Sequence, residues 1–450
     1  MTRRFGTDGV RGVANVDLTP ELVLALGRAA ARVFAADHFL VGRDTRISGS
    51  MLLAALSAGI TAEGADVLDL GVMPTPGVAW ASADRRLPAA MISASHNPFP
   101  DNGIKLFAPG GRKLSDRVED GLEAELDRLL LGTAGPRPGP VGADLGQVSM
   151  FDGRAGYVAA LAASLEGRRL DGLAVVLDCA NGAAAGVAPE ALAAVGARVA
   201  VINDRPDGTN INAGAGSNHP EALAAEVVAR GADAGLAFDG DADRVVAVDG
   251  AGNVVDGDQL IAICALDRKA RHSLAGDTVV VTVMANLGFR QAMQQHGIAV
   301  VETKVGDRYV LEALEEGGWA LGGEQSGHVI FRDLATTGDG ILTGLQVLDV
   351  MQRSGKPLSE LAAVMTRLPQ VLRNVAVLDR QGLEGAADFW GEVDAVRRRL
   401  GDHGRVLVRP SGTEPVVRVM VEAPTLAEAE TSCEELCAAV TRSLGAPVGR

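Results

Sequence analysis

The sequence lacks the cysteine pattern of a secreted or zinc-binding protein. It contains four cysteines in 450 residues, with no C-x-x-C pair and no histidine at zinc-finger spacing. Such usage is typical of a reduced, cytoplasmic protein. The basic N-terminus also lacks the apolar core of a signal peptide, and no apolar run is long enough to cross a bilayer. We therefore expect a soluble protein that stays in the cytoplasm.

An excess of positive charge is missing as well. The formal net charge is -15 at pH 7, which argues against a nucleic acid or an anionic membrane as the partner. A negatively charged substrate would then need local groups of arginines. Such groups occur near the N-terminus, in one loop and near the C-terminus: Arg3, Arg4 and Arg11, then Arg43 and Arg46, and finally Arg409 and Arg418. Each of them could equally be a solvated surface group.

The length of the chain exceeds what one core can hold and predicts three or four domains. Alternating helix and strand patterns predict three similar α/β units with mixed, mostly parallel sheets, and the pattern after Pro369 predicts a smaller α+β domain. A stretch rich in glycine and proline, from Gly132 to Pro140, marks the first boundary. We expect the domains to span residues 1–148, 149–252, 253–367 and 368–450.

One short segment concentrates acidic residues. Asp239, Asp241 and Asp243 stand at alternate positions directly after an apolar run. Two unit charges about 4 Å apart repel by roughly 4 kcal/mol at an effective dielectric constant near 20, so three inward carboxylates need a cation, and a hard divalent metal suits them. A calcium loop of the EF-hand type is excluded because Arg244 and Gly250 stand where that loop needs Gly and Glu. A polar turn between two strands remains the alternative.

A second segment carries groups suited to phosphoryl chemistry. Ser95 and His96 follow a predicted strand at Ala89 to Ile92, and open α/β sheets bind ligands at the carboxyl ends of their strands. Ser95 could accept a phosphoryl group there, although a Ser/Asn-Pro turn explains the same residues. Lys105 follows shortly after and could bring an ammonium group to this site or be solvated.

Two later loops have the composition of sugar and phosphate binding loops. Gly323-Glu324-Gln325-Ser326-Gly327-His328 places a carboxylate, an amide, a hydroxyl and an imidazole between glycines, as expected for hydrogen bonds to sugar hydroxyls. Arg409-Pro410-Ser411-Gly412-Thr413-Glu414-Pro415, followed by Arg418, combines backbone N–H groups with two guanidinium groups and can hold a phosphate. A polar turn and a tight proline-glycine turn are the respective alternatives.

Taken together, five segments resemble the α-D-phosphohexomutase superfamily in order and spacing. They are residues 5–12, 93–98, 239–244, 323–328 and 409–415, and the match runs nearly from end to end. Gln325 and the N-terminal segment most resemble the members that act on glucosamine phosphates. The resemblance implies an isomerase-class phosphotransferase that interconverts glucosamine 6-phosphate and glucosamine 1-phosphate through a phosphoserine and a 1,6-bisphosphate. That step would feed UDP-N-acetylglucosamine and peptidoglycan precursor synthesis.

The resemblance also implies a role for each residue near the reacting phosphate. Ser95, with His96 beside it, would carry the phosphoryl group. One Mg²⁺ per subunit would be bound by a phosphoserine oxygen of Ser95 and by Asp239, Asp241 and Asp243. Arg244 would neutralise charge next to the metal. The candidates for proton transfer are Arg11, Lys105 and His328.

Substrate binding is implied for two groups of residues. Contacts to the sugar hydroxyls would come from Glu324, Ser326 and His328. The phosphate that does not react would be bound by Arg409, Ser411, Gly412, Thr413 and Arg418. A hexose or hexosamine 1,6-bisphosphate would act as primer, and a homodimer is one open assembly.

Three other functions are weighed against this one. Phosphomannomutase or phosphoglucomutase activity on the same fold is opposed only by Gln325 and the N-terminal segment. An aspartyl-phosphate enzyme of the haloacid dehalogenase type is opposed by Asp243, which stands where that motif needs Thr or Val. A non-catalytic sugar-phosphate sensor could dispense with Ser95 and the acidic residues, yet this chain keeps both.

Overall fold

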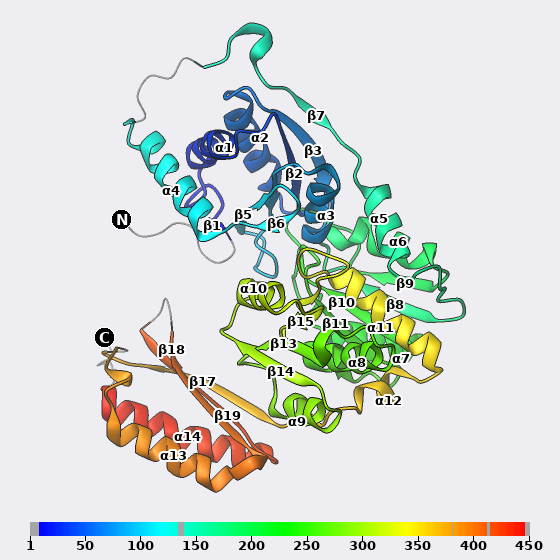
Figure 1. Ribbon diagram of the computed structural model, residues 1–450, viewed down its shortest axis with the longest axis vertical. Helices are drawn as coiled ribbons and strands as arrows, with labels where there is room; N and C mark the ends of the chain where they lie inside the picture. The colour runs from blue at the N-terminus through cyan, green and yellow to red at the C-terminus, as the bar shows by residue number, and fades with distance from the viewer. Residues whose placement is uncertain (1–8, 134–138, 380, 412–414, 446–450) are drawn as a thin grey trace. The chain divides into compact units, whose positions relative to one another are not determined.

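The computed structural model describes residues 9–133, 139–379, 381–411 and 415–445 (Figure 1). The chain divides into two compact units. The larger comprises Met1–Met284 with Ile298–Val364, and the smaller comprises Ala285–Gly297 with Met365–Arg450. None of the described helices combines the length and the apolar character needed to cross a bilayer.

The first sheet of the larger unit has the strand order β1-β5-β4-β2-β3-β7, with β6 beside β5. Its central strands run parallel, whereas β5 is antiparallel to both β1 and β4. The strands are β1 Val10–Val13, β2 His38–Arg43, β3 Asp66–Val72, β4 Ala89–Ile92, β5 Asp101–Ala108, β6 Arg112–Lys113 and β7 Val148–Met150. Strand β7 continues this sheet past residue 148, where we expect the first domain to end.

The helices of this part begin where the sequence supplies caps. Helix α1 Pro20–Phe34 starts at Thr19, whose hydroxyl accepts the N–H of Leu22, and it ends at Ala35 in the left-handed conformation. The other helices are α2 Gly49–Thr61, α3 Thr75–Arg85 and α4 Asp116–Leu130. Buried aliphatic residues of α1, α2 and α4 join those of the sheet in one apolar core, which holds the ends of the strands in place.

A second sheet has the order β12-β11-β10-β8-β9. Strand β8 is parallel to β9 and β10, and β10 is antiparallel to β11. The strands are β8 Ala174–Asp178, β9 Arg198–Ile202, β10 Ala234–Phe238, β11 Val245–Asp249 and β12 Val254–Val255. The accompanying helices are α5 Arg154–Ala163, α6 Ala188–Ala194, α7 Glu221–Arg230 and α8 Gly257–Ala270.

A third sheet of the larger unit has the order β14-β13-β15-β16, again parallel with one antiparallel strand. Its strands are β13 Thr278–Thr282, β14 Ala299–Thr303, β15 Leu321–Gly323 and β16 Val329–Phe331. The helices of this part are α10 Asp307–Gly317, α11 Gly340–Ser354 and α12 Leu358–Ala362. The three mixed sheets confirm the predicted repetition of α/β units.

The smaller unit contains an antiparallel sheet, β17-β19-β18, with α13 and α14 on one of its faces (Figure 1). Its elements are α9 Leu287–Gln295, β17 Gln370–Ala376, α13 Ala387–Leu400, β18 Arg405–Pro410, β19 Val416–Glu422 and α14 Leu426–Leu444. Buried residues of these strands and of α13 and α14 form a separate core. This α+β unit confirms the fold predicted for the C-terminal part.

Candidate active site

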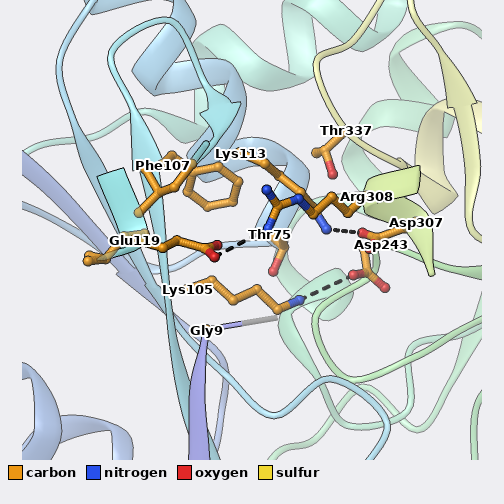
Figure 2. Close-up of a pocket in the computed structure, with 12 residues that line it drawn as sticks. Gly9, Thr75, Lys105, Phe107, Lys113, Glu119, Asp243, Asp307, Arg308 and Thr337 are labelled. Carbon is orange, nitrogen blue, oxygen red and sulfur yellow. Dashed lines mark hydrogen bonds and ion pairs between the residues drawn. The ribbon is translucent and has the colours of Figure 1, made fainter. Parts of the chain in front are cut away.

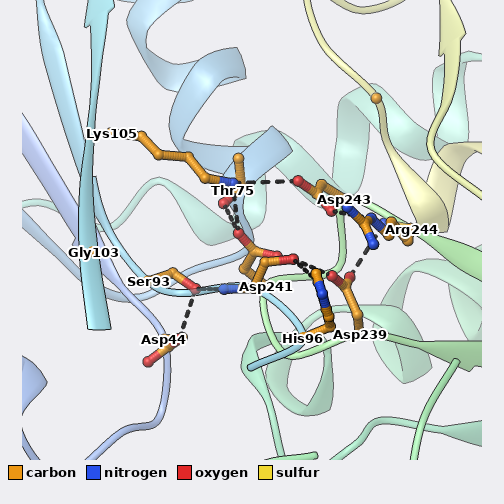
Figure 3. A network of polar contacts seen from close by, with 12 residues as sticks. Asp44, Thr75, Ser93, His96, Gly103, Lys105, Asp239, Asp241, Asp243 and Arg244 are labelled. Atoms are coloured by element: carbon orange, nitrogen blue, oxygen red, sulfur yellow. Dashed lines mark hydrogen bonds and ion pairs between the residues drawn. The ribbon is translucent and has the colours of Figure 1, made fainter. Parts of the chain in front are cut away.

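Ser95 lies on the loop that joins the buried strand β4 to β5, at the carboxyl end of β4. Its φ of +53° is in the left-handed region, which a serine rarely adopts. The backbone N–H of Ser95 donates to the Ser93 hydroxyl at 2.9 Å. The Ser95 hydroxyl donates to Oδ2 of Asp239 at 2.6 Å. Figure 3 shows Asp239 together with Asp241, Asp243 and Arg244. The two segments singled out in the sequence, 144 residues apart, therefore meet.

The three aspartates lie in the turn between the antiparallel strands β10 and β11. All three are buried, and one carboxylate oxygen of each lies within 4.8 Å of the others. The turn is held from several sides, because Asp241 accepts the Thr75 N–H on its backbone at 2.9 Å and the Thr75 hydroxyl on Oδ2 at 2.6 Å. Ala242, at φ +57°, accepts the N–H of Gly340 at 3.0 Å.

The charge of this cluster is not balanced by the protein alone. Among the described residues, Oδ1 of Asp241 and Oδ1 of Asp243 are buried without a hydrogen-bond partner. Burial, together with repulsion from Asp243 and Asp241, raises the pKa of Asp239 well above its usual range. Unsatisfied carboxylate oxygens and mutual repulsion both disappear when a hard cation binds between them. The residues present therefore fit a divalent metal such as Mg²⁺.

Lys105 reaches the acidic cluster from the middle of β5. Its side chain is 10% exposed, and Nζ lies 3.1 Å from Oδ2 of Asp241 and 3.3 Å from Oδ2 of Asp243. Burial opposes the ionisation of Asp243, but the Lys105 ammonium and His328 outweigh it and lower the pKa of that carboxyl. Lys105 and Asp243 both line a pocket with Thr75, Lys113, Asp307 and Arg308 (Figure 2). Three cationic side chains line this pocket, and each pairs with a carboxylate of the same lining: Lys105 with Asp243, Lys113 with Asp307 and Arg308 with Glu119.

His328 is buried between two carboxylates. Its Nδ1 lies 3.7 Å from Oδ2 of Asp243, and its Nε2 lies 3.5 Å from Oδ2 of Asp307. Nε2 accepts the backbone N–H of Gly338 at 3.2 Å, so in the neutral imidazole the proton is on Nδ1 and faces Asp243. Burial disfavours the imidazolium, but Asp243, Asp307 and Glu324 outweigh it and raise the pKa of His328. A histidine of this kind can hold or release a proton near neutral pH.

The remaining residues of the predicted sugar loop differ in exposure. Glu324 is half-buried, and its Oε1 accepts the N–H of Gly306 at 3.2 Å. Burial and the charge of Asp307 raise the pKa of Glu324. Ser326 is exposed, and Nε2 of Gln325 is buried without a hydrogen-bond partner among the described residues. A loop whose polar groups are exposed or lack a hydrogen-bond partner suits a polar ligand.

Arg244 and His96 flank Ser95 and the acidic cluster. Nε of Arg244 lies 3.8 Å from Oδ1 of Asp243, and Nδ1 of His96 lies 3.4 Å from the Ser95 hydroxyl. Burial and the positive charges of Arg244 and Arg11 lower the pKa of His96. Arg11 lies on β1, where its Cα pairs with that of Gly103 on β5. His96 therefore lies in a positive environment, in which its neutral form is favoured.

The predicted phosphate loop belongs to the smaller unit. Arg409 on β18 pairs in register with Arg418 on β19, and Ser411 is buried directly after β18. Burial and the neighbouring Arg418 lower the pKa of Arg409. Two adjacent guanidinium groups suit a phosphate. Gly412 and Thr413 lie outside the described residues.

Several residues of the site carry no recognisable signal in the sequence. Thr75 comes from the start of α3, and Asp307 and Arg308 from the start of α10, while Lys113 pairs with Asp307 from β6. Burial opposes ionisation of Asp307, but Lys113 and His328 lower the pKa of that carboxyl. These four residues come from three separate elements and form no motif, so only the folded chain brings them together.

The chain matches the four domain models of one family along most of its length. They are described as phosphoglucomutase/phosphomannomutase alpha/beta/alpha domain I over residues 2–131, domain II over 155–252, domain III over 256–368 and the C-terminal domain over 372–439. The chain thus belongs to the phosphoglucomutase/phosphomannomutase family of the α-D-phosphohexomutase superfamily. It is a mutase of the isomerase class.

Two curated relatives with the same name are similar to this chain over almost its whole length. A phosphoglucosamine mutase of Clavibacter michiganensis subsp. michiganensis is 53% identical over 99% of this chain and 100% of its own length. A phosphoglucosamine mutase of Moorella thermoacetica is 54% identical over 96% of this chain and 97% of its own length.

Solved structures share the fold. A phosphoglucomutase/phosphomannomutase family protein from Burkholderia thailandensis has a TM-score of 0.80 at 25% identity, covering 98% of each chain. An N-acetylphosphoglucosamine mutase from Aspergillus fumigatus, solved with GlcNAc-6P and magnesium, has a TM-score of 0.70 at 20% identity, covering 98% of this chain and 96% of its own.

Proposed function

We propose that this mutase interconverts glucosamine 6-phosphate and glucosamine 1-phosphate by way of a phosphoryl group on Ser95. The observation that carries the proposal is the 2.6 Å contact between the Ser95 hydroxyl and Asp239 of the buried acidic cluster. The choice of an amino sugar is supported by the full-length relatives named phosphoglucosamine mutase. The free cysteines support the expected cytoplasmic location.

Asp239, Asp241 and Asp243 would hold Mg²⁺, with a phosphoserine oxygen as a further ligand. A phosphoserine carries about -1.5 to -2 charges at neutral pH. A bound Mg²⁺ would offset that charge and stabilise the phosphoryl group during transfer. Arg244, 3.8 Å from Asp243, would add positive charge on the same side.

In the first half-reaction, the free hydroxyl of the sugar phosphate would attack the phosphorus on Ser95. A bond from the sugar oxygen to phosphorus forms, the bond from phosphorus to the Ser95 oxygen breaks, and the hydroxyl proton passes to a base. Lys105, His328 and Arg11 are the candidates for that base. His328 is supported by its place between Asp243 and Asp307 and by its raised pKa.

The product of this step is a 1,6-bisphosphate, whose other phosphate must return to Ser95 after the sugar has turned. Glu324, Ser326 and His328 would bind the sugar hydroxyls in both orientations. The phosphate that does not react would be bound by Arg409, Ser411, Gly412, Thr413 and Arg418. A hexose or hexosamine 1,6-bisphosphate would restore the phosphoserine when it is lost. Assembly as a homodimer stays a prediction.

A substrate comparison tests this proposal. The purified enzyme, primed with glucose 1,6-bisphosphate and supplied with Mg²⁺, is assayed with the 1-phosphates of glucosamine, glucose and mannose. We expect the highest kcat/KM for glucosamine 1-phosphate. A clearly higher kcat/KM for mannose 1-phosphate or glucose 1-phosphate would overturn the substrate and leave the mutase chemistry in place.

A further inference from the structure

Arg46 is among the largest fully buried side chains among the described residues. It follows β2 in the loop after Arg43, and it is 1% exposed. All five guanidinium N–H groups are used inside the protein. Nε donates to Oδ2 of Asp44 at 2.8 Å, and both terminal nitrogens donate only to backbone carbonyls. This arginine therefore does not bind the anionic substrate, which is one of the two roles that its sequence position suggests.

The carbonyls that Arg46 binds all belong to the loop that carries Ser95. Nη2 donates to the carbonyl oxygens of Ser95 and Asn97, each at 2.8 Å. Nη1 donates to the carbonyl of Pro98 and, at 3.0 Å, to that of Asp101. One side chain thus holds the whole path from Ser95 to the start of β5.

Asp44 connects the same guanidinium to the backbone N–H of Ser95. Its Oδ2 accepts the Ser93 hydroxyl at 2.6 Å, and that hydroxyl accepts the Ser95 N–H at 2.9 Å. Ser95 is therefore held on its N–H side through Asp44 and Ser93, and on its carbonyl side by Arg46. Asp44 also balances the buried charge of Arg46.

A second side chain binds two of these carbonyls from another segment. Nδ2 of Asn212 donates to the carbonyl oxygens of Ser95 at 2.9 Å and of Asn97 at 3.1 Å. The backbone of Gly240, between two of the acidic residues, comes so close that a Cβ there would lie 2.6 Å from the Ser95 carbonyl oxygen. The Ser95 carbonyl is thus enclosed by Arg46, Asn212 and the acidic turn.

The number of hydrogen-bond donors around the Ser95 turn has a physical reason. The left-handed conformation of Ser95 is unfavourable for a serine and persists only where its surroundings fix it. Without outside donors, the buried carbonyl of Ser95 would lack a partner. A relaxed turn would also rotate the Ser95 hydroxyl away from Asp239.

We propose that Arg46 is a positioning residue, whose guanidinium fixes the Ser95 turn so that the hydroxyl faces the acidic cluster. Asp44, Ser93 and Asn212 complete this support. The inference rests on the proposed role of Ser95 as the phosphoryl carrier. A displacement of about 1 Å at a reacting atom can cost about 10²-fold in rate. Loss of this support is therefore expected to lower kcat while substrate binding changes little.

Kinetics of the full-length enzyme test this assignment. Arg46→Lys and Arg46→Ala are expected to lower kcat for glucosamine 1-phosphate by about 10²-fold, with KM within about twofold of the wild-type value. Added guanidinium ion is expected to restore at least about tenfold of kcat to Arg46→Ala, whereas methylammonium restores none. The matched control is Arg32→Ala, because Arg32 is also largely buried but pairs with Glu63 and Glu125 instead. Arg32→Ala should keep its kcat and gain nothing from guanidinium.

Two results would overturn the assignment. One is a kcat of Arg46→Lys within twofold of wild type, and the other is a change confined to KM.

Asn212→Asp provides a second test if the Arg46 variants do not fold. It replaces the amide donor by an acceptor of the same shape, at a residue whose φ is +59°. It should lower kcat by about tenfold or more at unchanged KM, and an unchanged kcat would contradict the proposal. A failure of the Ser95 role would instead show in the wild-type enzyme, which would then carry no phosphoryl group on Ser95.

Discussion

At the level of single residues, the site gives each buried aspartate a different set of partners. Asp239 accepts the Ser95 hydroxyl, Asp241 accepts Thr75 and lies against Lys105, and Asp243 lies against Lys105 and His328. The single Lys105 ammonium is shared by two carboxylates, and Oδ1 of each still lacks a hydrogen-bond partner among the described residues. The aspartates of this repeating pattern therefore differ in ionisation and in the need for a cation, since the pKa of Asp239 is raised and that of Asp243 is lowered.

The variant Asp239→Asn tests this charge balance. Wild-type enzyme should show a higher thermal midpoint with Mg²⁺ than with EDTA, because a ligand that binds only the folded state stabilises it. The variant should lose this rise, and its kcat/KM should fall by at least about 10²-fold. In EDTA the variant should be no less stable than wild type, since the amide removes repulsion from Asp241 and Asp243. Calorimetry in both buffers measures the effect.

Asp178→Asn is the matched control for that experiment. Asp178 is a buried carboxylate at the end of β8 that accepts the N–H groups of Ala180 and Gly216, and it is not one of the clustered acids. Its variant should be destabilised and should keep the Mg²⁺-dependent rise. If Asp239→Asn kept the rise as well, the acidic cluster would not be the metal site.

A glycine beside His328 gives a second prediction at this scale. A Cβ on Gly338 would lie 2.3 Å from Nε2 of His328, so Gly338→Ala should displace the imidazole from Asp243 and Asp307. We expect kcat/KM to fall by about tenfold to 10²-fold. Gly121→Ala is the control, because that helical position in α4 has open space around its Cβ. It should keep full activity and stabilise the fold by about 0.5–1 kcal/mol. Equal activity of the two variants would contradict the placement of His328.

The sequence predicts those site residues that stand in compact motifs. Ser95, the three aspartates and the loop of His328 can be singled out in the sequence because several polar groups occur together after an apolar strand. The buried position of Arg46 is not predicted, because nothing in the sequence distinguishes an arginine bound to backbone carbonyls from a solvated one. Thr75 and Asp307 are missed, since each is a single polar residue whose neighbours in space come from distant segments.

At the level of elements, the start of α11 connects the parts of the site. Asp339 caps this helix by accepting the N–H of Leu342 at 2.9 Å, and it accepts the Tyr157 hydroxyl of α5 at 2.7 Å. The next residue, Gly340, donates to Ala242 in the acidic turn, and the preceding residue, Gly338, donates to His328. The N-terminus of α11 thus supports the acidic turn and the histidine together.

The ionisation of Asp339 predicts a pH-dependent stability. Burial raises the pKa of Asp339 to about 6, against about 3.9 in an unfolded chain. Between those values the folded state keeps a proton that the unfolded state has lost. Its stabilising contribution is therefore complete below about pH 4 and is lost as the pH rises through about 6, for a total of about 3 kcal/mol.

Asp339→Asn removes this titration and keeps the shape of the cap. The free energy of unfolding of the variant relative to wild type should rise by up to about 3 kcal/mol from pH 4 to pH 7, as measured by urea unfolding. In a chain that keeps Asp339, Tyr157→Phe should enlarge the pH dependence of the free energy of unfolding, because the Tyr157 hydroxyl lowers the pKa of Asp339. Parallel pH profiles of wild type and Asp339→Asn would contradict the buried, raised pKa.

Most elements are predictable because their local signals agree. The cap at Thr19 predicts α1, and the β-branched run from Val279 predicts β13. The pairing of β7 with β3 is not predictable, since three exposed residues after a linker show no alternation of apolar and polar positions. Its place in the sheet depends on contacts that only the assembled fold provides.

At the scale of the whole molecule, the smaller unit includes a segment that is remote in sequence. Glu422 at the end of β19 is fully buried, and it accepts the N–H of Leu287, Nε2 of Gln370 and the guanidinium of Arg405. Asn286 bonds both the N–H and the carbonyl of Leu368. These bonds attach residues 285–297 to the C-terminal sheet. A division of the sequence into continuous domains does not predict this attachment.

Glu422→Gln should therefore destabilise the smaller unit by about 3–5 kcal/mol, because Arg405 loses its buried counter-charge. In calorimetry, the transition of the smaller unit should move to lower temperature while that of the larger unit stays. The control is Glu435→Ala, which removes an exposed partner of Arg399 and should cost less than about 1 kcal/mol. Equal shifts for both variants would contradict the role of Glu422.

The central claim is that Ser95 carries the phosphoryl group which moves onto the sugar. Enzyme labelled from ³²P-glucose 1,6-bisphosphate is mixed with glucosamine 6-phosphate, and peptide mass spectrometry and rapid quenching follow the label. We predict that the label is on Ser95 and passes to the bisphosphate at a rate no slower than kcat, and that Ser95→Ala carries none. Label on another residue, or label on Ser95 that leaves more slowly than turnover, would contradict the mechanism.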